Sequence, residues 1–365
     1  MVCPYSLSRP GGVQQQVMSL TAALRRAGHD VRIVAPLDGP PPEPGVFGVG
    51  PSVEWESNGS MAPIATGGAV ARLTIAAINA IEPDVVHVHE PLVPGPALTL
   101  LLSFEGPMVG TFHLSGQFKV EWVKAALPAF VGRLAAWCAV SEAAATQART
   151  TYRHECEVLW NGIDLDAFAG VEPFPSDRPA VLFLGRHEPR KGLNVLVDAW
   201  RGIDRDAVLW VAGTGTASDA FRKGKLPDVE WLGVLPEKEK IARLKGASVY
   251  CAPSLGGESF GIVLVEAMAA CTPVVATQID GYANVARPDR EAVLVPPGDA
   301  DALRAALQRV LDDADLRARL VAAGSTRAQE FSMDRLAARY VEIYRSAVET
   351  AGPLRRVDDA RWRRH

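Results

Sequence analysis

The sequence predicts an α/β protein of two domains, each built on a mostly parallel β-sheet with helices on both faces. Short apolar runs typical of buried strands alternate with longer segments of helical periodicity, and this alternation occurs twice along the chain. A Pro-rich stretch from Val171 to Pro179 separates the two rounds, as a linker would. The 365 residues exceed what one hydrophobic core usually supports, and 48% hydrophobic with 22% charged residues is a globular composition.

The first round opens with Gly11 and Gly12 ahead of a helix whose apolar residues, from Val13 to Leu24, recur at helical spacing. Gly28 marks the end of this helix, and a second helix is predicted over residues 69–80. The apolar segment Met1-Val-Cys3 is either a very short strand or the last part of one that starts upstream. Other strands are predicted at 31–35, 84–90, 108–113, 137–140 and 157–160, with a Pro/Gly-rich loop over 36–50.

The second round is more regular than the first. Buried strands are predicted at 180–184, 207–212, 229–232, 248–252, 273–277 and 292–295. Helices are predicted at 193–200, 237–245, 260–270, 301–312, 316–331 and 333–349.

Charge and cysteine content narrow the class of protein. The net charge of −4 offers no global basic field for nucleic acid. The five cysteines include no C-x-x-C pair, which is typical of reduced thiols in a cytoplasm rather than of disulfides or zinc ligands. No run approaches 18 apolar residues, so no membrane span is expected. The basic tail at 354–365 is either a solvated end or a contact with an anionic membrane.

The segment from Pro253 to Glu266 carries the strongest functional signal. A Gly256-Gly257 turn leads into a predicted helix, whose first N–H groups have no partners within the helix and therefore attract anions. Glu258 stands at the predicted helix start, and Glu266 follows about 12 Å further on, within about 80° of the same flank. The segment therefore predicts an anion site beside two carboxylates that could bind the hydroxyls of a sugar nucleotide.

The loop from Gly185 to Gly192 predicts a second anion site. It holds Arg186, Arg190 and Lys191 at the carboxyl end of a predicted strand, where open α/β sheets bind ligands. The alternative is a solvated charged loop, and the order of residues is not that of a P-loop. Gly11-Gly12 offers a third, weaker phosphate site, for which a plain tight turn is an equal alternative.

Three histidines lie on the predicted strands of the first domain. His113 ends a buried strand, where it could contact substrate or be a buried histidine with satisfied hydrogen bonds. His87 and His89 alternate on one strand face and could begin a metal site, but no third ligand stands at a suitable spacing. We therefore expect no metal, and cations with helix starts would stabilise a leaving group instead.

Together these residues resemble the retaining GT-B glycosyltransferases over nearly the whole chain. The shared motifs are Gly11-Gly12, Thr111-Phe-His113, Asn161-Gly-Ile-Asp164, Gly185-Arg186, Arg190-Lys191 and Gly257–Glu266. The segments Val2–Ser6, Pro10–Gln14 and Tyr250–Gly261 are similar to the actinobacterial phosphatidyl-myo-inositol mannosyltransferases. This resemblance implies two Rossmann-like domains facing an interdomain cleft. Residues 1–168 plus 340–365, with a returning last helix, would bind the acceptor, and residues 169–339 would bind the nucleotide sugar.

The resemblance also implies an activity and its partners. The chain would be a metal-independent hexosyltransferase that moves mannose from GDP-mannose to phosphatidyl-myo-inositol with retention of configuration. It would need no cofactor besides the nucleotide sugar and would bind no nucleic acid. It would work in the cytoplasm, peripherally at the anionic inner face of the plasma membrane.

Site residues follow from the same resemblance. Gly12 would let the donor diphosphate approach, Arg186 and Lys191 would neutralise its charge, and Glu258 would hold sugar hydroxyls. Glu266 would take the ribose hydroxyls, and His113 would contact the transferred sugar. The rest of the donor site would be Gly257, Ser259, Phe260 and Gly261, and the acceptor site would include Tyr5, Gln14 and His113.

The sequence departs from that family in ways that keep alternatives open. Position 271 is Cys where the family has a glycine-containing turn, so a left-handed backbone is expected to strain it. Residues 59–79 offer only Arg72 where the family has a basic cluster for membrane docking, although 118–124 could form an amphipathic contact instead. The alternatives are a retaining glycosyltransferase with another nucleotide sugar or a soluble or different glycolipid acceptor, and a non-catalytic sugar-nucleotide sensor. An NAD-dependent dehydrogenase would need the G-x-G-x-x-G fingerprint that the chain lacks.

Overall fold

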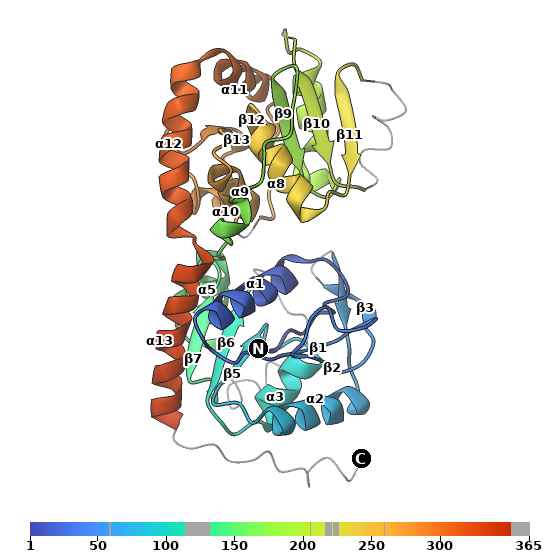
Figure 1. The fold of residues 1–365 in the computed structure, drawn as a ribbon, viewed down its shortest axis with the longest axis vertical. Helices are drawn as coiled ribbons and strands as arrows, with labels where there is room; N and C mark the ends of the chain where they lie inside the picture. Colours follow the sequence, from blue (N-terminus) through green and yellow to red (C-terminus); the bar gives the residue numbers. More distant parts are fainter. Residues whose placement is uncertain are drawn as a thin grey trace. The chain divides into compact units, whose positions relative to one another are not determined.

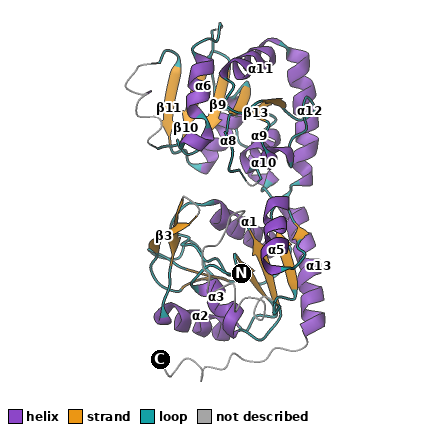
Figure 2. Ribbon diagram, turned by 180° about the vertical axis from the view of Figure 1, so that it is seen from behind, coloured by secondary structure: helices purple, strands orange, loops and turns teal. Residues whose placement is uncertain are grey.

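The computed structural model divides the chain into two compact units. It describes residues 1–57, 60–113, 132–204, 206–215, 221, 226–258 and 260–351. Unit 1 comprises Met1–Gly162 together with Met333–His365, and unit 2 comprises Ile163–Ser332. Figure 1 shows their elements in chain order, and Figure 2 shows the strands of each unit with helices packed around them.

Unit 1 is built on a parallel sheet. Its strands are β1 (Ile33–Ala35), β2 (Val46–Gly48), β5 (Val86–His89), β6 (Met108–Phe112), β7 (Ala136–Ala139) and β8 (Glu157–Val158). Within the described residues, β1 pairs with β2, and β5 to β8 pair in sequence order. Val2 bridges Val34 of β1 and Val88 of β5 in parallel, so the first residues join the two groups of strands. An antiparallel hairpin, β3 (Val53–Ser57) and β4 (Ser60–Ile64), forms a second sheet, and its Ile64 bridges Tyr5.

The helices of unit 1 include one from the far end of the sequence. They are α1 (Gly12–Arg26), α2 (Gly68–Ile81), α3 (Pro96–Ser103), α5 (Glu142–Tyr152) and α13 (Met333–Ala351). Helix α13 packs against α1 and β6, and its Met333, Ala337 and Tyr340 share a buried cluster with Leu20 and Leu24 of α1. An Arg26–Asp334 ion pair of 2.9 Å joins the same two helices.

Unit 2 has the strand order of a doubly wound fold. Its strands are β9 (Ala180–Leu184), β10 (Val208–Ala212), β11 (Val229–Gly233), β12 (Val249–Ala252), β13 (Val274–Thr277) and β14 (Val293–Val295). In the described part of the unit they form a parallel sheet with the order β11-β10-β9-β12-β13-β14. The order reverses between β9 and β12, and ligands of such folds bind beyond the carboxyl ends of the strands at that point.

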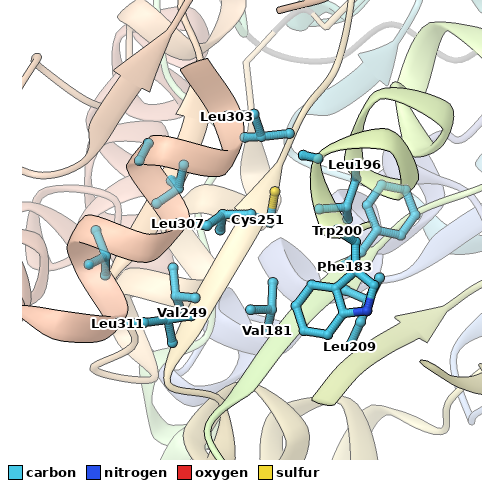
Figure 3. Packing of buried hydrophobic residues seen from close by; sticks show 14 of the residues in the cluster. Val181, Phe183, Leu196, Trp200, Leu209, Val249, Cys251, Leu303, Leu307 and Leu311 are labelled. Atoms are coloured by element: carbon cyan, nitrogen blue, oxygen red, sulfur yellow. The ribbon is translucent and has the colours of Figure 1, made fainter. Parts of the chain in front are cut away.

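The helices of unit 2 cover this sheet with apolar faces. They are α6 (Leu193–Trp200), α8 (Glu237–Gly246), α9 (Ile262–Ala269), the short α10 (Asp280–Ala283), α11 (Ala300–Asp312) and α12 (Ala314–Glu330). Figure 3 shows Leu303, Leu307 and Leu311 of α11 with Leu196 and Trp200 of α6 on one side of the sheet. Between them lie Val181, Phe183, Leu209, Val249 and Cys251, all essentially inaccessible to solvent. This core holds β9 and β12 rigidly beneath the loops that follow them.

Most predicted elements lie within a few residues of the observed ones, with three corrections. The loop predicted over 36–50 contains β2, because its residues pair with β1. The hairpin β3–β4, α3, α5 and α10 were not predicted. The units divide at 162/163 and 332/333 rather than after 168 and 339, because α13 packs against α1 from its first residue, Met333. Among the described residues, no helix is both long enough and apolar enough to cross a bilayer.

Candidate functional site

The two loops at the switch point of unit 2 lie in direct contact. β9 and β12 are paired, so the loops that follow them leave the same edge of the sheet. The amide of Leu255 donates to the carbonyl of Arg190 at 2.7 Å. Gly192 has a left-handed backbone with φ of 69°, and a Cβ on it would stand 1.9 Å from the Pro253 carbonyl oxygen. Only glycine permits this approach, so the two loops predicted to bind anions lie side by side.

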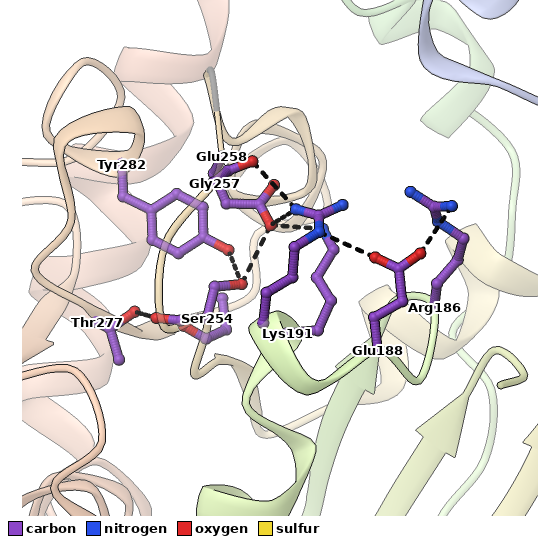
Figure 4. A network of polar contacts seen from close by, with 10 residues as sticks. Arg186, Glu188, Lys191, Ser254, Gly257, Glu258, Thr277 and Tyr282 are labelled. Atoms are coloured by element: carbon purple, nitrogen blue, oxygen red, sulfur yellow. Dashed lines mark hydrogen bonds and ion pairs between the residues drawn. The ribbon is translucent and has the colours of Figure 1, made fainter. Parts of the chain in front are cut away.

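Glu258 is the centre of a charged network at this site (Figure 4). Its Oε1 lies 2.6 Å from Lys191 Nζ and 3.3 Å from the guanidinium of Arg190. Arg190 also donates to the Gly257 carbonyl at 3.1 Å. Glu188 Oε2 then pairs with Arg190 at 2.9 Å, and its Oε1 pairs with Arg186 at 2.8 Å. The predicted cations Arg186, Arg190 and Lys191 therefore belong to the same cluster as Glu258.

Ser254 forms a hydrogen bond with Glu258 and is itself held by two further polar side chains. Ser254 Oγ donates to Glu258 Oε1 at 3.3 Å and lies 2.8 Å from the Tyr282 hydroxyl. Thr277 donates to the Ser254 carbonyl at 2.5 Å. Ser254, Thr277 and Tyr282 are buried, and together with Glu188 they were missed by the sequence analysis. Thr277 on β13 and Tyr282 on α10 leave no local sequence signal, whereas Ser254 and Glu188 lie within the two segments that the sequence analysis singled out.

The prediction that Glu258 stands at the start of a helix is wrong. Helix α9 begins at Ile262, with Gly261 before it, because Gly256, Gly257 and Gly261 have φ values of 153°, 72° and 92°. The helical spacing predicted between Glu258 and Glu266 is therefore wrong. The buried ring of Phe260 packs edge-on against Phe331, so its side chain belongs to the core.

Glu266 lies on α9 and is paired with a lysine that the sequence analysis did not single out. Lys240 Nζ of α8 lies 2.9 Å from Glu266 Oε1 and 2.9 Å from Glu237 Oε1. Burial raises the pKa of Glu266, and the Lys240 ammonium offsets only part of this effect. Burial alone would lower the pKa of Lys240, but the carboxylates of Glu266 and Glu237 outweigh it and raise that pKa. The Glu266 side chain, 17% exposed, remains accessible to a ligand.

In unit 1, three of the predicted donor and acceptor residues, Tyr5, Gly12 and Gln14, follow Val2, which bridges β1 and β5. Gly12 begins α1, and a Cβ on it would meet no atom within 4 Å, so the helix start is open. Gln14 is buried and donates to the carbonyls of Ser6 and Arg9 at 3.4 and 3.3 Å, so it braces the intervening loop. Tyr5 is also buried, and burial raises its pKa well above the ordinary value.

His113 follows β6 and is held from two sides. Its backbone N–H donates to Glu90 Oε1 at 2.5 Å, and its Nε2 lies 2.8 Å from His89 Nδ1. Burial lowers the pKa of His113 to about 3, so the ring is neutral at physiological pH. Glu90 and His89 are further residues of this cluster whose roles the sequence analysis did not predict.

The His87-x-His89 pair is part of a hydrogen-bonded network. Both ring nitrogens of His87 are engaged, Nδ1 with the Tyr344 hydroxyl and Nε2 with Thr111 Oγ1, each at 2.7 Å. Thr111 Oγ1 in turn lies 2.9 Å from the Tyr340 hydroxyl. Among the described residues, no group of three or more His, Cys, Asp or Glu side chains is placed to hold a metal ion. Ser259, the segment 118–124 and the tail at 354–365 lie outside the described residues.

The fold and the site define the class of protein. Two Rossmann-like units with glycine-lined, cationic loops at a switch point make this chain a GT-B glycosyltransferase. The model of glycosyl transferases group 1 matches residues 166–327, and that of glycosyltransferase family 4 matches residues 10–167. The solved structure of sucrose-phosphate synthase from Thermosynechococcus elongatus has the same fold. Its TM-score is 0.71 at 23% identity, over 95% of this chain and 96% of that one.

Sequence relatives define the family within that class. Phosphatidyl-myo-inositol mannosyltransferase of Mycobacterium leprae is 36% identical over 96% of this chain and 97% of its own length. The protein of the same name from Propionibacterium freudenreichii is 36% identical over 87% of each chain. The chain belongs to the phosphatidyl-myo-inositol mannosyltransferase family, and it is a hexosyltransferase.

Proposed function

We propose that this enzyme transfers mannose from GDP-mannose to phosphatidyl-myo-inositol, with retention of configuration and without a metal ion. The observation that carries the proposal is the 36% identity to phosphatidyl-myo-inositol mannosyltransferases along nearly the whole chain, together with the cationic cluster on Glu258. The donor chemistry rests on unit 2 and the acceptor chemistry on unit 1.

In unit 2, Lys191 and Arg186 stabilise the diphosphate as it leaves. Both side chains are already placed by carboxylates, Lys191 by Glu258 and Arg186 by Glu188. Preorganised cations stabilise developing negative charge without the cost of reorganising at the moment of reaction. When the donor binds, Glu258 accepts hydrogen bonds from the sugar hydroxyls, and Gly257 lets the sugar approach the backbone. Glu266 accepts from the ribose hydroxyls.

The reaction exchanges one bond at the anomeric carbon. The acceptor hydroxyl forms a new bond to C1 on the face from which the diphosphate departs, and the bond from C1 to the phosphate oxygen breaks. That phosphate oxygen takes the proton of the acceptor hydroxyl, so no side chain is needed as the nucleophile. His113 contacts the transferred sugar, while Tyr5 and Gln14 line the acceptor site.

The test is transfer from labelled GDP-mannose to phosphatidylinositol in vesicles, with and without a chelator. We expect a mannosylated lipid of retained configuration at an unchanged rate when the chelator is present. No activity with this pair of substrates, or complete loss of activity with chelator, would refute the proposal.

A second candidate is transfer to a different acceptor, and one observation favours it. Helix α2, with the sequence GAVARLTIAAINAI, has Arg72 as its single basic residue, whereas anionic lipid attracts a surface by about 1 kcal/mol per basic residue. Co-sedimentation with phosphatidylinositol vesicles distinguishes the two candidates. Binding that persists in 0.15 M salt supports the lipid acceptor, and no binding supports a soluble one.

A further inference from the structure

A proton-sharing pair of histidines connects the strands β5 and β6 of unit 1. His89 on β5 faces Thr111 in the register of the two strands, so His113, two residues beyond Thr111, extends from the same face. His89 Nδ1 and His113 Nε2 lie 2.8 Å apart. On its other side, the His89 ring stacks on His87 with a centroid distance of 4.2 Å.

Only one proton can lie between these two nitrogens. Burial lowers the pKa of both imidazoles, so each ring carries a single N–H. Either His89 donates from Nδ1 and His113 accepts at Nε2, or the direction is reversed. The choice sets which nitrogen of His113 carries its proton.

The second nitrogen of His89 decides between the two arrangements. His89 Nε2 is fully buried and has no hydrogen-bond partner in the described structure. If His113 were the donor, His89 would carry its proton on Nε2 as an orphaned buried N–H, which costs about 1–3 kcal/mol. Orphaned buried N–H groups are rarer than buried acceptors with an unused lone pair. The favoured arrangement therefore has His89 donating from Nδ1.

The remaining nitrogen of His113 is then a donor. With Nε2 accepting from His89, the proton of His113 resides on Nδ1. Within the described residues, no hydrogen bond occupies this Nδ1. The bond to Glu90 Oε1 fixes the backbone of His113, and the Nε2 contact with His89 together with burial holds its ring in place.

We propose that His89 is a positioning residue that holds His113 in its Nδ1–H tautomer, so that His113 donates a hydrogen bond from Nδ1 to an oxygen of the transferred hexosyl group. The inference rests on the proposed function for the identity of that group. The tautomer itself is a property of the free protein. A protonated Nδ1 can donate to a sugar oxygen that is itself an acceptor, whereas an unprotonated nitrogen could only accept from a sugar hydroxyl.

The first test measures the tautomers directly in the wild-type protein. The seven histidines are labelled with 15N, and two-bond nitrogen–proton correlations assign the protonated nitrogen of each ring. His113→Gln and His89→Asn spectra identify the two rings. Nδ1–H for both residues is the expected result. A proton on Nε2 of His113 overturns the proposal, even if the enzyme proves to transfer mannose.

The second test separates positioning from packing by activity. His89→Leu removes the donor, and we expect kcat to fall about tenfold to a hundredfold while KM for the donor changes less than about twofold. In His89→Asn the amide nitrogen takes the place of Nδ1, and we expect it to recover most of kcat. Equal losses in both variants, or wild-type kcat in a folded His89→Leu protein, would overturn the inference.

Tyr344→Phe is the matched control in the same buried cluster. It removes the hydroxyl bonded to His87 but leaves the His89–His113 pair intact. We expect its kcat to stay within about twofold of wild type. A loss as large as that of His89→Leu would show a general packing effect and count against a specific role of His89. An inactive wild-type enzyme would refute the proposed function, whereas the tautomer measurement would stand independently.

Discussion

Glu258 shows how single residues keep this site ready for a charged substrate. One of its oxygens contacts two cations and a serine, and its side chain is only 14% exposed. The carboxylate holds Lys191 in the place where, in the proposed mechanism, the diphosphate of the donor binds. Arg190 and Lys191 are therefore already placed in the free protein, before any donor binds.

Replacing Lys191 with Ala is expected to slow transfer. Without the ammonium group, charge on the leaving diphosphate loses a preorganised partner, and kcat should fall about 10²-fold, or about 2.7 kcal/mol. The measurement is the initial rate at saturating donor. Lys238→Ala, an exposed lysine on α8, is the control and should keep the wild-type rate. Unchanged turnover in the Lys191 variant would remove this residue from the mechanism.

Replacing Glu266 with Ala is expected to weaken donor binding. Hydrogen bonds to a charged acceptor contribute about 1.5–3 kcal/mol, so the Kd for GDP-mannose should rise roughly tenfold to a hundredfold. Calorimetric titration measures this change. Glu237→Ala removes the other carboxylate on Lys240, which is largely exposed, and should leave the Kd within about threefold. Similar affinities for both variants would contradict the ribose role of Glu266.

At the scale of elements, the site depends on how closely two loops approach. The turn at Gly192 starts α6 and lies against Pro253 at the end of β12. This contact aligns the loop that carries Lys191 with the loop that carries Glu258. The order of strands in the sheet, and not proximity in sequence, brings the two loops together.

Gly192→Ala is expected to disrupt this alignment. The new methyl group would collide with the Pro253 carbonyl, and the left-handed backbone is unfavourable for alanine. Together these two costs should lower the free energy of unfolding by roughly 2–5 kcal/mol. Gly170→Ala is a matched control in the same unit, because its φ of 67° is almost equal and its Cβ would meet no atom within 4 Å. It should lose only about 1–2 kcal/mol. Urea unfolding compares the two variants, and equal losses would show that the loop contact contributes nothing.

At the scale of the whole molecule, the same doubly wound plan is used twice. In unit 1 the first residues lie between β1 and β5, just as β9 lies between β10 and β12 in unit 2. Each unit therefore has its own switch point. Lys191 and Glu258 follow the strands at that of unit 2, whereas His113 follows β6 and Glu266 lies within α9. The core of unit 1 differs in burying three histidines.

These histidines predict that acid destabilises the protein. Burial lowers the pKa of His87, His89 and His113 in the folded state, whereas the unfolded state titrates near pH 6.5. The unfolded chain therefore binds more protons below pH 6.5, and stability is lost as the pH falls from there toward 3. Each histidine should contribute about 1.4 kcal/mol of loss between pH 7.5 and 5.5.

Urea unfolding at both pH values tests this expectation in wild type and His87→Asn. The variant should lose about 1.4 kcal/mol less than wild type on acidification. The control His29→Asn changes an exposed histidine and should show the wild-type pH dependence. Equal pH dependence in all three proteins would show that the buried imidazoles gain protons in the folded state as well.

Much of the fold could be predicted from the sequence, because hydrophobic periodicity is a local signal. Every strand predicted for unit 2 is present, and α13 was predicted from its own apolar face. The strain expected at Cys271 is also observed, with φ of 59°. Short elements such as β2 and α10 were not predicted, because they carry little hydrophobic periodicity and are stabilised by contacts with neighbouring elements.

The sequence by itself determined the two α/β rounds, the glycine loops and the cations and carboxylates they carry, because these depend on residue type and spacing along the chain. Only the tertiary structure decided which residues are in contact: Arg190 and Lys191 with Glu258 Oε1, Lys240 with Glu266, and His89 with His113. It also moved the start of α9 to Ile262, where three glycines in the left-handed half of φ space delay the helix. Hydrogen bonds and ion pairs join residues that strand order brings together, and strand order is a property of the folded chain.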